Sequence, residues 1–508
     1  MQAPKRASGT RYGVRRSNRS IAGDYKSWNF KSLITAICLQ FRWTIVDIIR
    51  ATPKMQSRFH HQYYSVKRNS RNGWRRWLGA GIGMMALVVL VYQVPFVNDR
   101  LSWRIDNLRT RIVYFFNPPD EVVFVPQGQL TAEALPGAAT SIVTSSPQAG
   151  VTSTPTATEV PLPGSVNLDG VVYVDQHNRW NYCGPANLTM ALNYWGWAGD
   201  RDDVGAYVKP GIFNADSGKE DKNVMPYEME DFVDSQVPGM QAVVRVGGEL
   251  ETVKKLITAG FPVVVEKGYY ERDYTGKIGW LGHYLFVTGY DDPGGYFIVQ
   301  DAYLRTGADG TGANLHSSYA EFTEQWRSFN FLFMVVYPEE KLDELLVALG
   351  PWADEGWANA RALEIARADV QTLSGNDLYF AWFNVGSSHV RLQQYVDAAS
   401  AYDHAFGVIY PSLGDDNTQR PYRMMWYQTG PYWAYYYSGR YGDVIALADD
   451  TLRTVDTPTL EESIYWRGMA RLAIGETGNA VADFQQAVRI NPNFWAGIQQ
   501  LQALGVSG

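Results

Sequence analysis

The most marked pattern of hydrophobic and polar positions is an apolar run at residues 78–97, which holds no charged residue. At 20 residues, the run has about the length that a helix needs to cross the hydrocarbon core of a bilayer. Trp74, Trp77 and Tyr92 lie where aromatic side chains meet the membrane interface. The pattern therefore predicts one transmembrane helix over residues 77–98, and a buried core helix is the alternative.

Charge divides the chain at this run. Residues 1–76 carry 17 Lys and Arg against two Asp, a net charge of +15, and the remainder carries 28 basic and 50 acidic residues, a net charge of −22. Because basic flanks of a span stay in the cytoplasm, we expect a single-pass cell-membrane protein with a cytoplasmic N-terminus and an extracytoplasmic remainder. Membrane lipid is then a partner through the span. The basic segment has no nucleic-acid-binding motif, so we expect no nucleic acid partner.

Three further patterns follow the run. Residues 99–165 begin as a juxtamembrane segment and turn at about Asn117 to Pro, Ser, Thr, Ala and Gly, a composition that predicts an extended linker. Residues 166–340 mix helical and strand patterns, which predicts an α+β domain. Its strand candidates are residues 261–270, 283–290, 295–303 and 331–337. Residues 345–508 are helical in pattern throughout.

The helical pattern of residues 345–508 contains a repeat. Its clearest copy, residues 461–493, matches the tetratricopeptide pattern at Gly468, Ala480, Phe484 and Ala487. Fainter copies include Gly386, Ala398, Tyr402 and Ala405 in one, and the stretch SGRYGDVIALADDTL in another. Ala398, Val444 and Ala480 occupy equivalent positions at intervals of 46 and 36, so the first interval contains an insertion.

Stacked copies predict an all-α, tetratricopeptide-like solenoid of about three repeats, and an ordinary helical bundle is the alternative. A groove for a peptide or protein partner is the functional hypothesis for this domain. Rigid spacing or packing against the neighbouring domain is the other role that the pattern allows.

One of the chain's two cysteines lies at the start of a predicted helix, in the stretch NYCGPANLTMALNYWG. Pro185 suits the first helical turn, and apolar residues then recur at helical spacing. These residues are Leu188, Ala191, Leu192 and Trp195. Cys183 thus lies at a helix N-terminus, where the helix dipole favours a thiolate. Since Cys38 precedes the predicted span, Cys183 lacks a disulfide partner outside the cell, and it is either a nucleophile or a small buried hydrophobe.

A nucleophile needs a base and a group that orients the base. His283 opens the strand pattern GHYLFVTGY, and the turn DDPGG leads to a second strand, YFIVQD. If the hairpin turns about Asp292 or Pro293, His283 faces a position between 301 and 303, and Asp301 has the matching parity. We therefore expect Asp301 to hold His283, and a core hairpin with a hydrogen-bonded histidine is the alternative.

Two residues of the loop before the cysteine complete the candidate site. His177 ranks second as a base, because no carboxylate lies at hairpin distance from it. Gln176 lies seven residues before Cys183, so its amide is a candidate oxyanion donor beside the backbone N–H of Cys183.

These stretches together resemble the bacteriocin-processing cysteine peptidases, cysteine peptidase family 39, and their stand-alone relatives with a papain-like fold. The resemblance covers residues 170 to 338 approximately, and rests on Gln, Cys-Gly-Pro, Gly-His and a strand-end Asp in the family's order. It implies an α+β papain-like domain in which a helix backs an antiparallel sheet. It also implies an oxyanion donor in Gln176, a nucleophile in Cys183, a general base and acid in His283 and an orienting residue in Asp301.

The resulting hypothesis is a membrane-anchored cysteine peptidase that acts on a peptide or protein substrate. We expect no cofactor and no metal, since the chain has no H-E-x-x-H and no closely spaced Cys and His set. The chain also lacks the G-x-x-x-x-G-K-[ST] loop of the exporters to which bacteriocin-processing relatives are joined. The alternatives are a catalytically inactive scaffold that binds peptides or envelope proteins, and a thiol acyltransferase such as a transamidase.

Overall fold

The computed structural model describes residues 83, 124, 126, 161–179, 181–210, 222–272, 278–413, 421, 423–455 and 459–506. The described residues from 83 onward belong to one compact unit. Among the helices that these ranges contain, none is both long and apolar enough to span a membrane. The transmembrane helix expected at residues 77–98 lies outside the described residues, apart from Gly83, and so does the basic segment at residues 1–76.

A seven-stranded antiparallel sheet organises the first part of the described chain, and its strands run in the order β2-β7-β3-β4-β5-β6, with β1 paired to β4. The strands are β1 (Ser165–Asn167), β2 (Met240–Arg245), β3 (Val263–Arg272), β4 (Ile278–Asp291), β5 (Tyr296–Gln300), β6 (Leu315–Ser318) and β7 (Phe333–Pro338). The four expected strands correspond to β3, β4, β5 and β7, whereas the sequence pattern did not indicate β1, β2 and β6.

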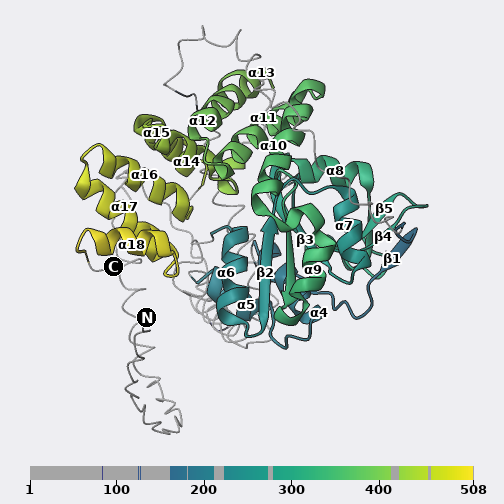
Figure 1. Cartoon of the computed structure of the whole chain (residues 1–508). Helices are drawn as coiled ribbons and strands as arrows, with labels where there is room; N and C mark the ends of the chain where they lie inside the picture. Colours follow the sequence, from purple (N-terminus) through teal and green to yellow (C-terminus); the bar gives the residue numbers. More distant parts are fainter. Residues whose placement is uncertain are drawn as a thin grey trace, which may run out of the picture. The chain divides into compact units, whose positions relative to one another are not determined.

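Helices cover both faces of the sheet (Figure 1). Because successive strand residues point to opposite faces, Val264 and Phe286 pack with one set of helices and Val263 and Leu285 with the other. The first set is α4 (Cys183–Tyr194), α5 (Arg201–Val208) and α6 (Pro226–Gln236). The second set is α7 (Leu250–Thr258), α8 (Tyr319–Arg327) and α9 (Leu342–Leu349). The result is an α+β domain.

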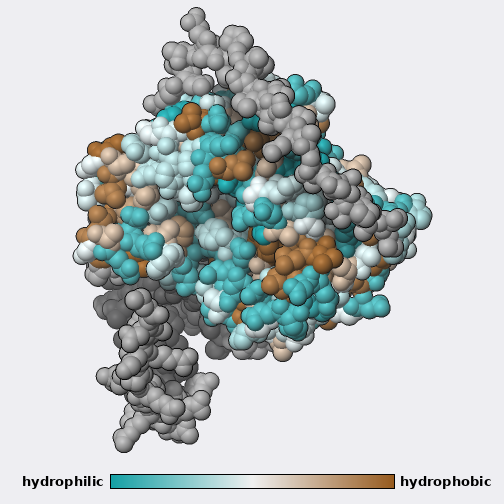
Figure 2. Space-filling view, in the orientation of Figure 1, coloured by the Kyte–Doolittle hydropathy of each residue, from teal (hydrophilic) through white to brown (hydrophobic). Residues whose placement is uncertain are grey.

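The last helix of this domain, α9, is apolar on two sides. Leu345 and Leu349 are buried in the core shared with α7 and β7. Leu342, Leu346 and Val347 instead face outward and are exposed. Figure 2 shows the resulting hydrophobic patch over α9.

The rest of the chain is helical and packs as a series in which each long helix contacts the next. The long helices are α10 (Glu355–Thr372), α11 (Gly375–Arg391), α12 (Tyr395–His404), α14 (Gly430–Tyr437), α15 (Tyr441–Arg453), α16 (Glu461–Ala473), α17 (Thr477–Ile490) and α18 (Trp495–Ala503). Short turns of helix lie between α12 and α14, namely η3 (Ala405–Ile409), α13 (Tyr410–Ser412) and η4 (Met424–Trp426). This helical region is consistent with repeats.

Close contacts between neighbouring helices recur between residues at the same separation in the sequence. A Cβ atom on Gly386 of α11 would lie 2.6 Å from the ring of Tyr402 on α12, and one on Gly468 of α16 would lie 2.8 Å from the ring of Phe484 on α17. Each glycine precedes its aromatic partner by 16 residues. The α14–α15 pair has the buried residues Tyr432 and Ala448 at these positions, so the large and small residues are exchanged there.

Two aromatic side chains from outside the helical region are buried in its hydrophobic core. Phe124 is buried in it, with its ring centroid 5.5 Å from that of Phe406 and 6.1 Å from that of Tyr435. It belongs to residues 99–165, which were expected to be a juxtamembrane segment followed by a linker, and of which the structure describes residues 124, 126 and 161–165. Trp280 on β4 of the α+β domain also packs in this core, beside Phe380 of α11.

Candidate active site

Cys183 is the first residue of α4, and its side chain is buried at 8% exposure. Its position is fixed by Asn187, one turn further along the helix. The Asn187 side-chain amide donates to the carbonyl of Cys183 at 2.8 Å and to the carbonyl of Tyr284 on β4 at 3.0 Å. One buried amide therefore ties the start of the cysteine helix to the strand residue that follows His283.

His283 lies on β4 and contacts both Cys183 and Asp301. Its Nε2 is 2.9 Å from Oδ1 of Asp301, and its ring lines the same pocket as the thiol, with which it interacts. Since Nε2 is occupied by the carboxylate, Nδ1 is the nitrogen left for the sulfur. Phe286 pairs with Gln300, so Asp301 follows the end of β5 and lies diagonally across from His283, at the same parity.

Asp301 is held by donors on several sides. Besides His283, its Oδ1 accepts the backbone N–H groups of Tyr303 at 2.9 Å and of Leu304 at 3.0 Å. The ammonium of Lys267, a buried residue opposite His283 on β3, lies 3.8 Å from Oδ2. Burial opposes ionisation, but the charge and hydrogen bond of His283 and the charge of Lys267 together hold the pKa of Asp301 well below its ordinary value.

The same contacts shift the pKa values of the cysteine and the histidine in opposite directions. Burial disfavours the thiolate, yet the hydrogen bond and charge of His283 lower the pKa of Cys183, and buried Lys209 adds to this effect. Burial likewise disfavours the imidazolium, but the charge of Asp301 and hydrogen bonds to Asp301 and Cys183 raise the pKa of His283 to about 9. The arrangement thus favours a thiolate beside an imidazolium.

The loop before α4 is tied to the strand end that carries Asp301. The backbone N–H of Gln176 donates to the carbonyl of Ala302 at 2.9 Å, and its side-chain Oε1 is buried without a hydrogen-bond partner. His177 does have a carboxylate, contrary to the sequence argument, because Asp175 lies only two residues away with its Oδ1 2.8 Å from Nδ1. His283 lines the pocket at Cys183, and His177 instead lines a separate cavity with Asp175.

A narrow pocket opens at the sulfur of Cys183, beside His283, Gly282 and Glu266. The space available to the centre of a water-sized sphere is about 10 Å³, room for one water. Burial, reinforced by negative charge on Cys183, raises the pKa of Glu266 well above its ordinary value, so a neutral carboxyl group faces the thiolate. The helical region supplies Tyr427 to the lining.

Five of these residues were missed by the sequence argument: Asn187, Lys209, Glu266, Lys267 and Tyr427. Asn187 carried a signal, because it is a polar residue among the apolar positions of the cysteine helix. Lys267 lies in an expected strand, but its meeting with Asp301 depends on the β3–β4 register. Within the described ranges, no group of three or more His, Cys, Asp or Glu side chains is arranged to hold a metal ion.

A cysteine at a helix N-terminus, beside a histidine that is held by an aspartate, has the chemistry of a thiol-dependent acyl hydrolase. Residues 168–333 match the family described as Peptidase_C39 like family. The resemblance to C39-like peptidases is therefore confirmed for this part of the chain, and it implies a cysteine peptidase.

A crystal structure described as that of a C39-like peptidase from Bacillus anthracis aligns with 34% of this chain and 98% of its own, at 16% sequence identity and a TM-score of 0.27. No curated protein matches the chain.

Proposed function

We propose that the chain is a cysteine peptidase in which Cys183, His283 and Asp301 act as a catalytic triad. The observation that carries this proposal is the buried relay from the thiol to His283 and from Nε2 of His283 to Asp301 at 2.9 Å. The match to C39-like peptidases supports the same activity.

In the acylation step, the Cys183 thiolate attacks the carbonyl carbon of a peptide bond, and the electron pair of the C=O bond moves to oxygen. Two donors are proposed for this oxyanion, the side-chain amide of Gln176 and the backbone N–H of Cys183, which precedes the hydrogen-bonded turns of its helix. The imidazolium of His283 then gives its proton to the leaving amine as the C–N bond breaks, which produces a thioester and neutral imidazole.

In the second step, a water molecule attacks the thioester while His283 takes one of its protons. The C–S bond breaks, the carboxylic acid product leaves, and the thiolate–imidazolium pair is restored. Asp301 stays ionised throughout. Its role is to fix the tautomer and orientation of His283 and to stabilise the imidazolium, and Lys267 supports the ionised state of Asp301.

Anchoring and location are a separate part of the proposal. The charge-free run at residues 78–97 and the basic excess before it support a single span, with the α+β domain and the helical region outside the cell. We propose a tetratricopeptide-like repeat domain that receives a protein partner, supported by the recurring glycine–aromatic contacts between its helices. Protease protection of sealed membranes, with a tag at each end of the chain, tests the orientation.

The activity is tested by digesting a peptide library with the full-length protein in ¹⁸O-labelled water and mapping the products by mass spectrometry. Labelled product carboxyl groups that disappear in Cys183→Ala support the peptidase. Products that form only with an added amine, and that carry the amine instead of the label, indicate a transamidase. The absence of any product, together with thiol labelling at the rate of an ordinary cysteine, indicates a scaffold and contradicts the proposal.

A further inference from the structure

The helical region contributes an insertion to the pocket of Cys183. Residues 423–428, here called the bridging segment, lie between α13 and α14 and include η4. They fall inside the repeat interval from Ala398 to Val444, which is 46 residues long against 36 for the next interval. The departure from the repeat length is therefore located where the helical region meets the candidate active site.

The bridging segment is hydrogen-bonded to the α+β domain at two places. On the side of α6, the side-chain amide of Asn223 donates to the carbonyl of Trp426 at 2.8 Å. On the other side, the side-chain amide of Gln428 donates to the carbonyl of Ser328, which follows α8, at 2.6 Å. The segment is thus held to the α+β domain on each side of Tyr427 in the sequence.

Tyr427 lies between these two contacts in the sequence and lines the pocket of Cys183. A backbone group of Gly282, the neighbour of His283, hydrogen-bonds to its hydroxyl. A Cβ atom on Gly282 would lie 2.8 Å from its ring, so this glycine permits the close approach. The ring also packs on Trp280 at 5.7 Å and on Phe329 at 6.0 Å, measured between ring centroids. The side chain is therefore held in the wall of the pocket that contains Cys183.

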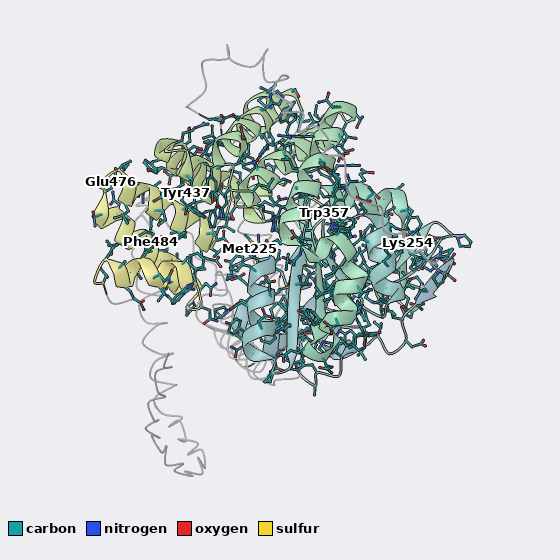
Figure 3. The ribbon with its side chains drawn as sticks, in the orientation of Figure 1. Met225, Lys254, Trp357, Tyr437, Glu476 and Phe484 are labelled. Carbon is teal, nitrogen blue, oxygen red and sulfur yellow. The ribbon has the colours of Figure 1, made fainter. Side chains whose placement is uncertain are left out.

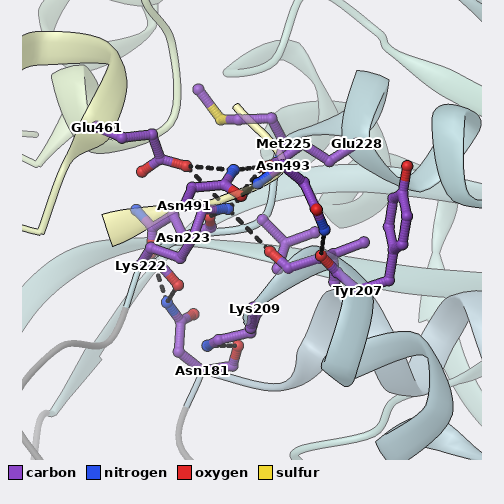
Figure 4. A network of polar contacts seen from close by, with 12 residues as sticks. Asn181, Tyr207, Lys209, Lys222, Asn223, Met225, Glu228, Glu461, Asn491 and Asn493 are labelled. Carbon is purple, nitrogen blue, oxygen red and sulfur yellow. Dashed lines mark hydrogen bonds and ion pairs between the residues drawn. The ribbon is translucent and has the colours of Figure 1, made fainter. Parts of the chain in front are cut away.

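A cluster of buried charges fastens the helical region to the same side of the α+β domain (Figure 4). Lys222, beside Asn223, places its ammonium 2.7 Å from Glu228 of α6 and 3.0 Å from Glu461 of α16. The side-chain amide of Asn491, which follows α17, donates to Glu228 at 2.8 Å. These four residues, Lys222, Glu228, Glu461 and Asn491, are called the interface ion cluster below. They hold the helical region against the pocket at a second place.

We propose that the bridging segment is an autoinhibitory latch, and that it must withdraw from Cys183 before a peptide binds. With Tyr427 in its wall, the pocket beside Cys183 has space for about one water. This proposal rests on the peptidase function proposed above, because it concerns regulation of the same site. The structure then represents a closed form, and the helical region controls access to the nucleophile.

The test measures access to the thiol rather than hydrolysis. In full-length protein carrying Cys38→Ala, Cys183 is the single cysteine, and its labelling rate is measured with iodoacetamide, a small reagent, and with the much larger fluorescein maleimide. Tyr427→Ala should raise the labelling rate with the large reagent about tenfold or more, because the open form is the minority in the closed protein. The rate with the small reagent should change much less.

Two further variants make the result specific. Tyr437→Ala removes an exposed tyrosine of the same region, at the end of α14 (Figure 3), and should leave both rates unchanged. Gln428→Ala releases one end of the bridging segment without altering the pocket lining, and should raise the large-reagent rate in the same direction. If Tyr427→Ala lowers the folded fraction measured by circular dichroism, the labelling rate of Gln428→Ala decides whether the latch exists.

The outcomes separate the latch from the peptidase. Unchanged large-reagent labelling in both Tyr427→Ala and Gln428→Ala overturns the latch, even where the protein hydrolyses peptides. Size-selective labelling that responds to both variants supports the latch. If the opened variants Tyr427→Ala and Gln428→Ala also cleave no peptide, only the peptidase proposal fails.

Discussion

Two clusters of buried charge in this protein use the same kinds of side chain, and they differ in whether a reactive atom borders a pocket. The catalytic cluster contains Lys267 and Asp301 around His283, and the interface ion cluster contains Lys222 between Glu228 and Glu461. Burial and charge oppose each other in both clusters. Burial raises the pKa of Glu228 against the charge of Lys222, whereas the charge of Asp301 raises the pKa of His283 against burial.

The difference lies in the reactive atom and the space beside it. The Lys222 ammonium donates to Glu228 and to the carbonyls of Val208 and Asn223, so its bonding capacity is filled within the protein. At the catalytic cluster, the relay ends on a sulfur that borders a pocket. A shifted pKa thus indicates burial and charge, whereas a candidate active site also needs a nucleophile that borders a pocket.

The largest expected effect separates the two clusters by activity. Cys183→Ala should abolish hydrolysis, and Asp301→Asn should lower kcat/KM by about ten-thousandfold, because the histidine loses its orienting charge. Glu461→Gln, in the interface ion cluster, should keep catalysis. The measurement is kcat/KM on a fluorogenic peptide found by the library digestion. If Asp301→Asn and Glu461→Gln lowered kcat/KM equally, the two clusters would not differ in their contribution to catalysis.

The next effect separates the clusters by stability. Lys222→Met leaves two carboxylates buried without their cation and should lower the free energy of unfolding by about 3–5 kcal/mol. Cys183→Ala should change it far less. Urea unfolding of the full-length protein measures both. Because protonation removes the repulsion, the loss in Lys222→Met should shrink as pH falls. A loss that is independent of pH would argue against an uncompensated pair of charges.

A smaller effect tests how the cysteine helix is joined to the histidine strand. Asn187→Ala leaves two buried carbonyls without their donor, which should cost about 1–3 kcal/mol of stability. Loss of the link should also lower kcat/KM by about a hundredfold through misplacement of the thiol. Asn479→Ala, at an exposed position of α17, is the matched control and should be nearly neutral. If Asn187→Ala lowers stability but leaves kcat/KM unchanged, the amide has no role in positioning the thiol.

The smallest expected effect is the pH dependence of the reaction. Hydrolysis needs the Cys183 thiolate and the His283 imidazolium together, so its rate should fall at low pH as the thiolate takes up a proton. It should also fall about tenfold per pH unit above 9, as His283 loses its proton. The raised pKa of His283 means that its stabilising contribution is complete below its unfolded value, near 6.5, and is lost as pH rises through about 9. A kcat/KM profile without the alkaline limb would contradict the acid role of His283.

Local patterns in the sequence were enough for part of this site. The helix that begins at Cys183 follows from Pro185 and the apolar spacing after it, and the shared face of His283 and Asp301 follows from the two-residue period of strands. Short or weakly alternating strands such as β6, LHSS, carry no comparable signal. The α+β class and the helical C-terminal region were predictable because each depends on repeated local spacing.

Contacts between distant segments were not predictable in this way. Lys267 meets Asp301 only in the observed register, which places Lys267 opposite His283. Tyr427 lies 144 residues beyond His283, and the interval from Ala398 to Val444 revealed that an insertion existed but not what it touched. His177 was ranked second for a wrong reason, since hairpin distance was the only spacing considered and Asp175 is almost its neighbour.

The position of Trp280 bears on where this chain can be cut. Its indole belongs to a strand of the α+β domain, yet it is 1% exposed because Phe380 and Tyr427 of the helical region enclose it. A truncated protein that ends after α9 would present this ring and Phe329 to water, and each aromatic side chain has an area of about 150–250 Å². Such a fragment should self-associate through this exposed apolar surface. The boundary that the sequence suggests between the two parts is therefore a poor site for separating them.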